Sequence, residues 1–228
     1  MILPFQLTCD SSLLVAIFRE RQRMLSWSLS APGFQEAKRV AWVEVRNADL
    51  PPETDPKALI TQRLESANVS DAVAMITSRS VARHQVSQVR VEDATATCVA
   101  TVGLSNGERV GQRLALEPAL GTINILAHVS CGLSQAAHVE AISIVASART
   151  AAVMDSGVRR GGVAITRTGT DCIVLAAPVN EHPASYAGMH TVVGEARGAA
   201  VYQVMEEGIA TWRADFDAMF RSPSTRRL

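Results

Sequence analysis

The order of its apolar segments is the feature that most constrains the fold of this chain. Strand-like segments dominate up to residue 129, and two long helix-like segments follow, at 134–156 and 191–220. This order lacks the strict strand–helix alternation of a doubly wound parallel sheet. We therefore predict an α+β fold, in which a single domain carries a mostly antiparallel or mixed sheet packed against two long helices.

Apolar–polar alternation and short apolar runs locate the strands. A short helix is expected from Pro56 to about Ser66, with Asp55 as its N-cap. Ser134 is expected to cap the first long helix, and Gly157 to end it. The strand-like segments are 13–18, 24–29, 39–46, 72–77, 84–91, 94–102, 122–129 and the last part of 161–177.

Length and charge limit the classes of partner. The chain has 228 residues, so we expect one domain over residues 1–220 and a flexible basic tail at 221–228. Lys and Arg number 22, as do Asp and Glu, so no overall nucleic-acid footprint is expected. The N-terminus lacks the basic region of a signal peptide, and no apolar stretch is long enough to span a bilayer. We expect a cytoplasmic protein without a membrane partner, and leave homo-oligomer formation open.

The cysteines and histidines form no local metal signature. The four cysteines are far apart in sequence, and Cys98 and Cys172 lie in apolar runs typical of buried free thiols. The patterns HxxxH and HExxH are absent, as are GxSxG, GxGxxG and the P-loop. No resident cofactor is therefore expected. A divalent-metal site built from distant residues such as His190 and Asp171 stays open.

Two clusters of glycine and polar residues precede or follow predicted strands. In the first, Ser105 and Asn106 could bind a carbonyl group or hold a water, although Asn106-Gly107 is also a common turn pair. In the second, Thr122 and Asn124 point to the same side of a strand because side chains alternate along it. This pair favours either a wet cleft or a solvent-facing edge strand.

Two further clusters carry the strongest candidates for chemistry. Thr168, Thr170 and Asp171 form a hydroxyl-rich turn that runs into a strand, where Asp171 could cap the backbone, orient a histidine, bind a cation or act as a base. His190 and Thr191 precede the last helix, where the helix dipole disfavours an imidazolium and so favours a neutral, basic imidazole. The alternative for His190 is a surface histidine in the helix cap.

Taken in order, five segments resemble the adenosylcobinamide amidohydrolase family of corrinoid salvage. They span about half of the chain, and together they are more specific than any one of them. The segments are Met75–Ser78 (MITS), Gly103–Gly111 (GLSNGERVG), Gly121–Ile125 (GTINI), Thr166–Val174 (TRTGTDCIV) and Tyr186–Gly194 (YAGMHTVVG).

The resemblance implies a reaction and a substrate. The family hydrolyses the amide that joins 1-amino-2-propanol to a corrin side chain, which converts adenosylcobinamide into adenosylcobyric acid. A small corrinoid is thus the implied partner. One departure concerns the central helix, where the family typically carries Thr-Glu-Ala-Lys-Thr. Here Ser147 replaces the acid and Arg149 the lysine, and Glu140 is the substitute acid we consider.

Amide hydrolysis needs an activated nucleophile, an oxyanion stabiliser and an acid for the leaving amine. We expect His190 as base and Asp171 as its orienting partner, with water as nucleophile and Thr168, Thr170 or Ser105 as covalent alternatives. Asn106, Asn124 and backbone N–H groups would stabilise the oxyanion, and Thr122 and Thr191 would contact substrate. Two other functions stay open: a non-catalytic corrinoid-binding protein and a metal-dependent amidase on another substrate.

Overall fold

The computed structural model describes residues 1–46, 49, 51, 53–112, 114 and 121–221, and side chains up to residue 217. The expected tail at 222–228 lies outside the described residues. The helices are α1 (Pro56–Ser66), α2 (Gln135–Asp155) and α3 (Val192–Arg221), with a 3₁₀ turn η2 (Val81–Arg83). The longer strands are β1 (Phe5–Asp10), β2 (Leu13–Ser26), β3 (Gly33–Glu44), β4 (Val73–Thr77), β5 (Gln85–Val91), β6 (Ala94–Val102), β8 (Ile123–Val129) and β12 (Cys172–Pro178).

These strands form one mixed sheet in the order β4-β3-β2-β12-β8-β6-β5, with β1 paired to β2. Most pairs are antiparallel, whereas β3–β4 and β12–β8 are parallel. Two short two-stranded sheets join β7 (Gly107–Glu108) to β11 (Arg167–Thr168) and β9 (Arg159–Arg160) to β10 (Val163–Ala164). The predicted α+β class with a mixed sheet and two long helices is confirmed.

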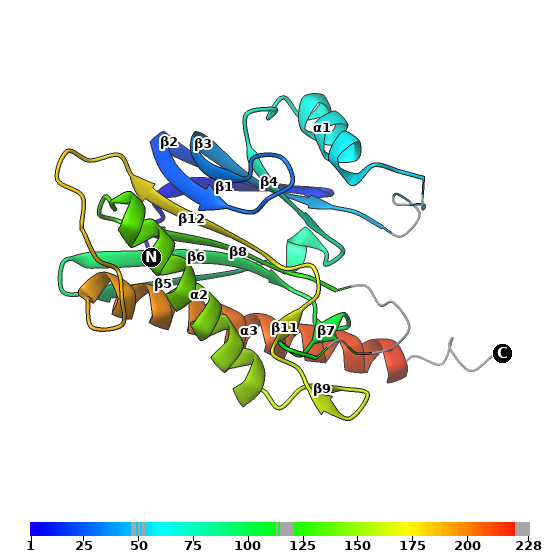
Figure 1. Ribbon diagram of the computed structural model, residues 1–228. Helices are drawn as coiled ribbons and strands as arrows, with labels where there is room; N and C mark the ends of the chain where they lie inside the picture. The colour runs from blue at the N-terminus through cyan, green and yellow to red at the C-terminus, as the bar shows by residue number, and fades with distance from the viewer. Residues whose placement is uncertain (47–48, 50, 52, 113, 115–120, 222–228) are drawn as a thin grey trace.

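The sheet folds over itself, so the molecule has four layers (Figure 1). The helix α1 packs on β2–β4 through a cluster that includes Ile60 and Leu64. Between the strands β2–β4 and the strands β6, β8 and β12 lies a second cluster, centred on Trp42, Met75 and Leu126. The other face of β6, β8 and β12 is covered by α2 and α3. The short helix α1 thus forms one outer layer, and the two predicted long helices, α2 and α3, form the other.

The strand β2 explains how one sheet reaches both inner layers. Sequence patterns suggested two strands, at 13–18 and 24–29, because Arg19, Glu20 and Arg21 interrupt the apolar pattern. The chain instead continues as one strand of 14 residues with these three side chains exposed. A register shift against β3 between Ile17 and Gln22 marks the irregularity. Bulges of this kind bend a strand, and past it β2 also pairs with β12.

Candidate functional site

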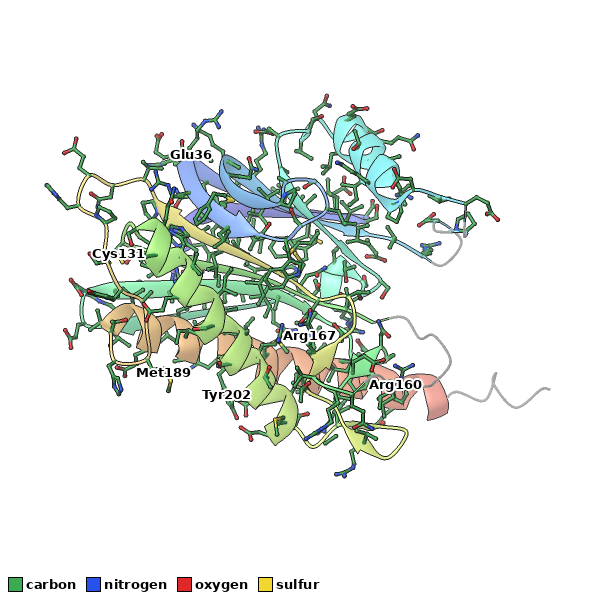
Figure 2. All side chains as sticks on the ribbon, viewed as in Figure 1. Glu36, Cys131, Arg160, Arg167, Met189 and Tyr202 are labelled. Atoms are coloured by element: carbon green, nitrogen blue, oxygen red, sulfur yellow. The ribbon has the colours of Figure 1, made fainter. Side chains whose placement is uncertain are left out.

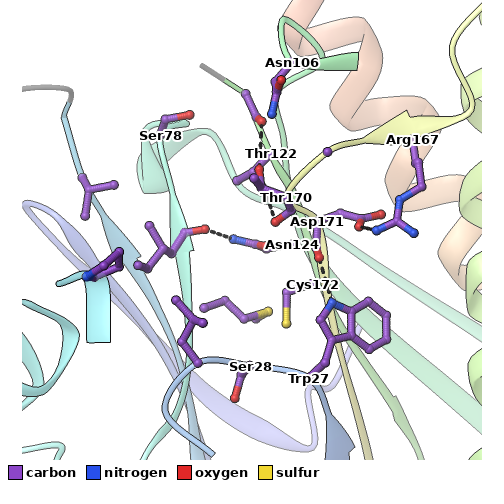
Figure 3. A pocket seen from close by; sticks show the side chains of 17 residues that line it. Trp27, Ser28, Ser78, Asn106, Thr122, Asn124, Arg167, Thr170, Asp171 and Cys172 are labelled. Carbon is purple, nitrogen blue, oxygen red and sulfur yellow. Dashed lines mark hydrogen bonds and ion pairs between the residues drawn. The ribbon is translucent and has the colours of Figure 1, made fainter. Parts of the chain in front are cut away.

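A cavity of about 640 Å³ opens where β8 and β12 begin, between the two inner layers (Figure 3). Its walls come from four of the five segments that carry the family resemblance. Met75, Ile76 and Ser78 belong to the first; Asn106 to the second; Gly121, Thr122 and Asn124 to the third; and Arg167, Gly169, Thr170, Asp171 and Cys172 to the fourth. Segments as far apart in sequence as residues 75 and 172 therefore meet at one place.

Thr122, just before β8, and Asn124, within it, both line the cavity, as the alternation predicted. Asn124 is fully buried, and its Nδ2 donates to the Ile76 carbonyl oxygen at 2.5 Å. The Trp42 indole donates to the Asn124 backbone oxygen at 3.4 Å. The Asn124 Oδ1 accepts no hydrogen bond from any described residue. One of the two Nδ2 hydrogens is therefore bound to Ile76 and the Oδ1 is without a donor, so Asn124 has an acceptor to offer, and the oxyanion role expected from the sequence stays a prediction.

Two threonine hydroxyls form a chain in the cavity. The Thr122 Oγ1 donates to the Thr170 carbonyl oxygen at 2.9 Å, and the Thr170 Oγ1 lies 3.3 Å from the Thr122 Oγ1 (Figure 3). Thr122 is 4% exposed, whereas Thr170 is open to solvent. Thr168 does not line the cavity; its buried Oγ1 accepts from the Ile123 backbone at 3.2 Å and holds the start of β8.

Asp171 is held between two arginines. Its carboxylate accepts hydrogen bonds from Arg149, on α2, and from Arg167, on β11. The Asp171 side chain has no exposed surface, so burial raises the pKa of this carboxyl, while the charges of Arg149 and Arg167 pull the pKa down. Both carboxylate oxygens are thus engaged by guanidinium groups. Asp171 is arranged to orient Arg167 and to tie α2 to β12 rather than to accept a proton.

Two backbone N–H groups close to Gly121 are unpaired. Neither the Ser105 nor the Asn106 backbone nitrogen donates to another residue in the described part of the chain. A Cβ added at Gly121 would lie 2.9 Å from each of these nitrogens, so they face the Gly121 backbone. Paired N–H groups can bind an oxygen that gains negative charge. The Asn106 side chain lines the cavity and Ser105 does not.

His190 and Thr191 lie at the other end of β12. This strand spans seven residues, about 20 Å of extended chain, and Asp171 precedes it while His190 follows it. Figure 2 shows Met189 and Arg167 well apart on the molecule. His190 is exposed and does not line the cavity. Thr191 caps α3 through a 2.9 Å bond from the Gly194 nitrogen. The expected His190–Asp171 pair is therefore not formed, because a whole strand separates the two residues.

The structure also locates the two residues of α2 that depart from the family pattern, and the substitute acid considered for them. Ser147 is exposed, so the acid that it replaces would sit on the surface of α2. Arg149 is buried, with a side chain 5% exposed, against Asp171. Glu140 accepts from the Ala187 backbone at 2.7 Å, near the His190 end of the molecule. Neither Glu140 nor Ser147 lines the cavity.

Trp27 and Arg167 line the cavity but are not among the individual site residues expected from the sequence. Trp27 follows β2, is 41% exposed, and donates from its indole to the Asp171 backbone oxygen at 2.9 Å. Arg167 lies beside the predicted hydroxyl turn, and its side chain is 38% exposed. No local signal marks Trp27, because 144 residues separate it from Asp171. The charge of Arg167 next to Asp171 was visible in the sequence as a signal of an ion pair.

The described residues contain no group of three or more His, Cys, Asp and Glu side chains arranged to hold a metal ion. Cys98 and Cys172 are buried free thiols, as predicted, and burial raises the pKa of each to about 12. No helix within the described residues is long and apolar enough to cross a membrane.

Comparison with known proteins gives one family. The family model described as adenosylcobinamide amidohydrolase matches residues 4–216. No curated protein matches the chain. Among solved structures, the PH0078 protein from Pyrococcus horikoshii OT3 is 10% identical with a TM-score of 0.44, covering 92% of this chain and 80% of that one. A Burkholderia sp. beta-aminopeptidase is 12% identical with a TM-score of 0.45, covering 91% and 83%.

Proposed function

The chain belongs to the adenosylcobinamide amidohydrolase family, and we propose that its cavity hydrolyses the aminopropanol amide of adenosylcobinamide. The products would be adenosylcobyric acid and 1-amino-2-propanol. In this reaction water adds a hydroxyl group to the acyl carbon, the carbon–nitrogen bond breaks, and the nitrogen leaves with a proton. One observation carries the proposal: four of the five segments that resemble the family converge on this cavity.

The size of the cavity suggests how such a substrate would bind. A volume of about 640 Å³ suits a side arm and its amide rather than a whole corrin with its peripheral groups. We propose that the aminopropanol arm enters and the corrin rests over the opening. Trp27 and Leu29 line the cavity and are 41% and 51% exposed, so they offer apolar surface to the corrin.

The polar groups of the cavity supply two of the requirements of amide hydrolysis. The unpaired backbone N–H groups of Asn106, which lines the cavity, and of Ser105, which adjoins it in the chain, are our proposed oxyanion donors. Arg149, Arg167 and Asp171 together carry one net positive charge at the wall, which favours a developing anion. We propose that the hydroxyls of Thr122 and Thr170 position the attacking water, with Thr170 as the covalent alternative.

The test is the release of 1-amino-2-propanol from adenosylcobinamide by the purified protein, measured together with corrinoid binding. Release that Thr122→Ala abolishes would support the proposal. Tight corrinoid binding without release would instead favour a corrinoid-binding protein. We propose that no resident metal is needed, so incubation with a chelator should leave the rate unchanged. Loss of activity that a divalent ion restores would favour a metal-dependent amidase.

A further inference from the structure

We propose that Asn124 determines specificity, because its side-chain carbonyl accepts a hydrogen bond from the N–H of the amide to be cleaved. The site would then select secondary amides over esters and over tertiary amides of the same acid. This inference rests on the proposed function, and it assigns to one buried side chain the recognition of one atom of the substrate.

The orientation of the Asn124 amide is fixed by its neighbours. Ile76 presents a carbonyl oxygen, which only the NH₂ end of the side chain can approach, and the Nδ2–oxygen distance is 2.5 Å. The Oδ1 is the other polar atom of this amide, and Asn124 is one of the residues that line the cavity (Figure 3). A second bond, from the Trp42 indole to the Asn124 backbone, holds β8 at the same residue.

The unpaired Oδ1 calls for a donor. Asn124 has no exposed surface, and no described residue donates to its Oδ1. A buried carbonyl oxygen without a donor is costly, so such groups in native proteins are normally satisfied by protein, water or ligand. In an amidohydrolase cavity, the matching donor on the substrate is the amide N–H.

The spacing of Asn124 and Thr122 fits this arrangement. Thr122 immediately precedes β8, Asn124 is the second residue of that strand, and both line the cavity; two steps of extended chain separate them by about 6.6 Å. A hydrogen bond of about 2.9 Å to the amide nitrogen, one C–N bond and an approach of about 3.3 Å to the carbonyl carbon cover a similar span. An amide held by Asn124 would thus place its carbon near the hydroxyls of Thr122 and Thr170.

The experiment crosses two enzymes with two substrates. Wild type and Asn124→Leu, which keeps the branched shape and removes the carbonyl, are compared on adenosylcobinamide and on its ester analogue, in which an oxygen replaces the N–H. Each enzyme gives one ratio, its kcat/KM on the amide divided by its kcat/KM on the ester. The ester differs from the amide in intrinsic reactivity equally for both enzymes, so the difference between the two ratios reports the contact of Asn124 with the N–H. We expect the wild type to favour the amide by about 10- to 100-fold relative to the variant. Equal ratios in the two enzymes would overturn the proposal.

Two controls keep the result interpretable if Asn124→Leu folds poorly. Asn124→Asp retains an acceptor, so it should keep the preference for the N–H even if its overall rate falls. Asn180→Asp changes an asparagine outside the cavity, whose Oδ1 accepts from the His182 backbone at 3.0 Å, and should match wild type on both substrates. Loss of the preference in Asn124→Asp, with an intact thermal unfolding transition, would contradict the acceptor role.

A binding measurement separates failure of this inference from failure of the proposed function. The probes are N-(2-hydroxypropyl)propanamide and its N-methyl derivative, with binding to the folded proteins followed by NMR. N-methylation should weaken binding about tenfold or more to wild type and have a smaller effect on Asn124→Leu. If wild type releases no aminopropanol but this difference is seen, the proposed reaction fails and the acceptor role stands. If wild type releases aminopropanol and N-methylation weakens binding by the same factor in wild type and Asn124→Leu, only the acceptor role fails.

Discussion

At the scale of single residues, occupancy of hydrogen-bonding groups decides what each side chain can do. Asp171 has the residue type of a base, but two guanidinium groups hold its carboxylate. Asn124 has the residue type of an oxyanion donor, but one of its two N–H groups is bound to Ile76 and its Oδ1 has no donor among the described residues. The hydroxyls of Thr122 and Thr170, by contrast, contact each other, and both residues line the cavity that we propose as the substrate site.

Thr122 should be sensitive to loss of its hydroxyl and tolerant of loss of its methyl group. We expect Thr122→Ala to reduce kcat by about 100-fold or more, because a positioned polar group contributes about that much to catalysis. Thr122→Ser retains the hydroxyl and should stay within about tenfold of wild type. Steady-state rates of aminopropanol release measure both. Equal rates for the Ala and Ser variants would remove the hydroxyl from the mechanism.

The sequence made His190 the expected base, and its position in the structure predicts a small effect instead. His190→Ala should change kcat/KM by no more than about twofold, because the side chain is exposed and lies outside the cavity. The same release assay measures this effect. A loss of several orders of magnitude with unchanged thermal stability would return His190 to the catalytic machinery.

At the scale of elements, the close packing of α3 depends on individual glycines. Gly194 and Gly198 are four residues apart, and the sequence indicated close backbone approach for both. A Cβ at Gly194 would lie 2.0 Å from the Gly188 carbonyl oxygen, whereas a Cβ at Gly198 would meet only the Ile144 side chain, at 3.5 Å. Only Gly194 is therefore required by a neighbouring backbone.

These two glycines provide a matched pair of variants. Gly194→Ala should destabilise the protein by about 1–3 kcal/mol, since backbone must move to admit the methyl group. Gly198→Ala should be neutral or stabilise by up to about 1 kcal/mol, because alanine loses less entropy in a helix interior. Urea unfolding followed by circular dichroism measures both free energies. A similar effect at the two positions would contradict the packing of α3.

The same helix carries a buried charge. Arg197 has no exposed surface, and its three guanidinium nitrogens have no hydrogen-bond partner among the described residues. Burial lowers the pKa of Arg197 to about 10. Replacing a poorly compensated buried charge with an apolar side chain is often stabilising, so Arg197→Met should raise the free energy of unfolding by about 1–4 kcal/mol. The midpoint temperature of thermal denaturation measures the effect. A clearly lower midpoint in Arg197→Met would mean that Arg197 has a compensating partner.

At the scale of the whole molecule, the interface between the two inner layers couples stability to pH. His128 lies in that interface, 4% exposed, with its ring 5.3 Å from the ring of Phe18. Burial, and to a lesser extent the charge of Arg197, lowers the pKa of His128 to about 3. Between about pH 6.5 and pH 3, His128 is therefore protonated in the unfolded chain and neutral in the folded protein. Because the unfolded state binds the extra proton, the free energy of unfolding falls as the pH falls.

The variant His128→Phe isolates this effect. From pH 7 to pH 5, wild type should lose about 2 kcal/mol more unfolding free energy than His128→Phe, because each unit between pH and the unfolded pKa contributes about 1.4 kcal/mol. Urea unfolding at both pH values gives the difference. Parallel pH profiles for the two proteins would show that His128 titrates normally in the folded state.

The sequence by itself determined the elements and the segments that matter. Alternation, caps and stop signals act over a few residues, so they predicted α1 at Pro56–Ser66 and the cap of α2 at Ser134, which the structure confirms. The edge strand β1 was missed because only Phe5 of its six residues is buried, which leaves little apolar pattern. The family resemblance likewise depended on local motifs.

Only the tertiary structure decided which motifs meet and which atoms stay free. A strand carries its two ends about 20 Å apart, so β12 placed Asp171 at the cavity and His190 away from it, although both lie in segments of the same family pattern. Arg149 contacts Asp171 across 22 residues of sequence, and the Ile76 carbonyl accepts one N–H of Asn124 across 48. Such contacts depend on how layers pack, and no local pattern encodes them.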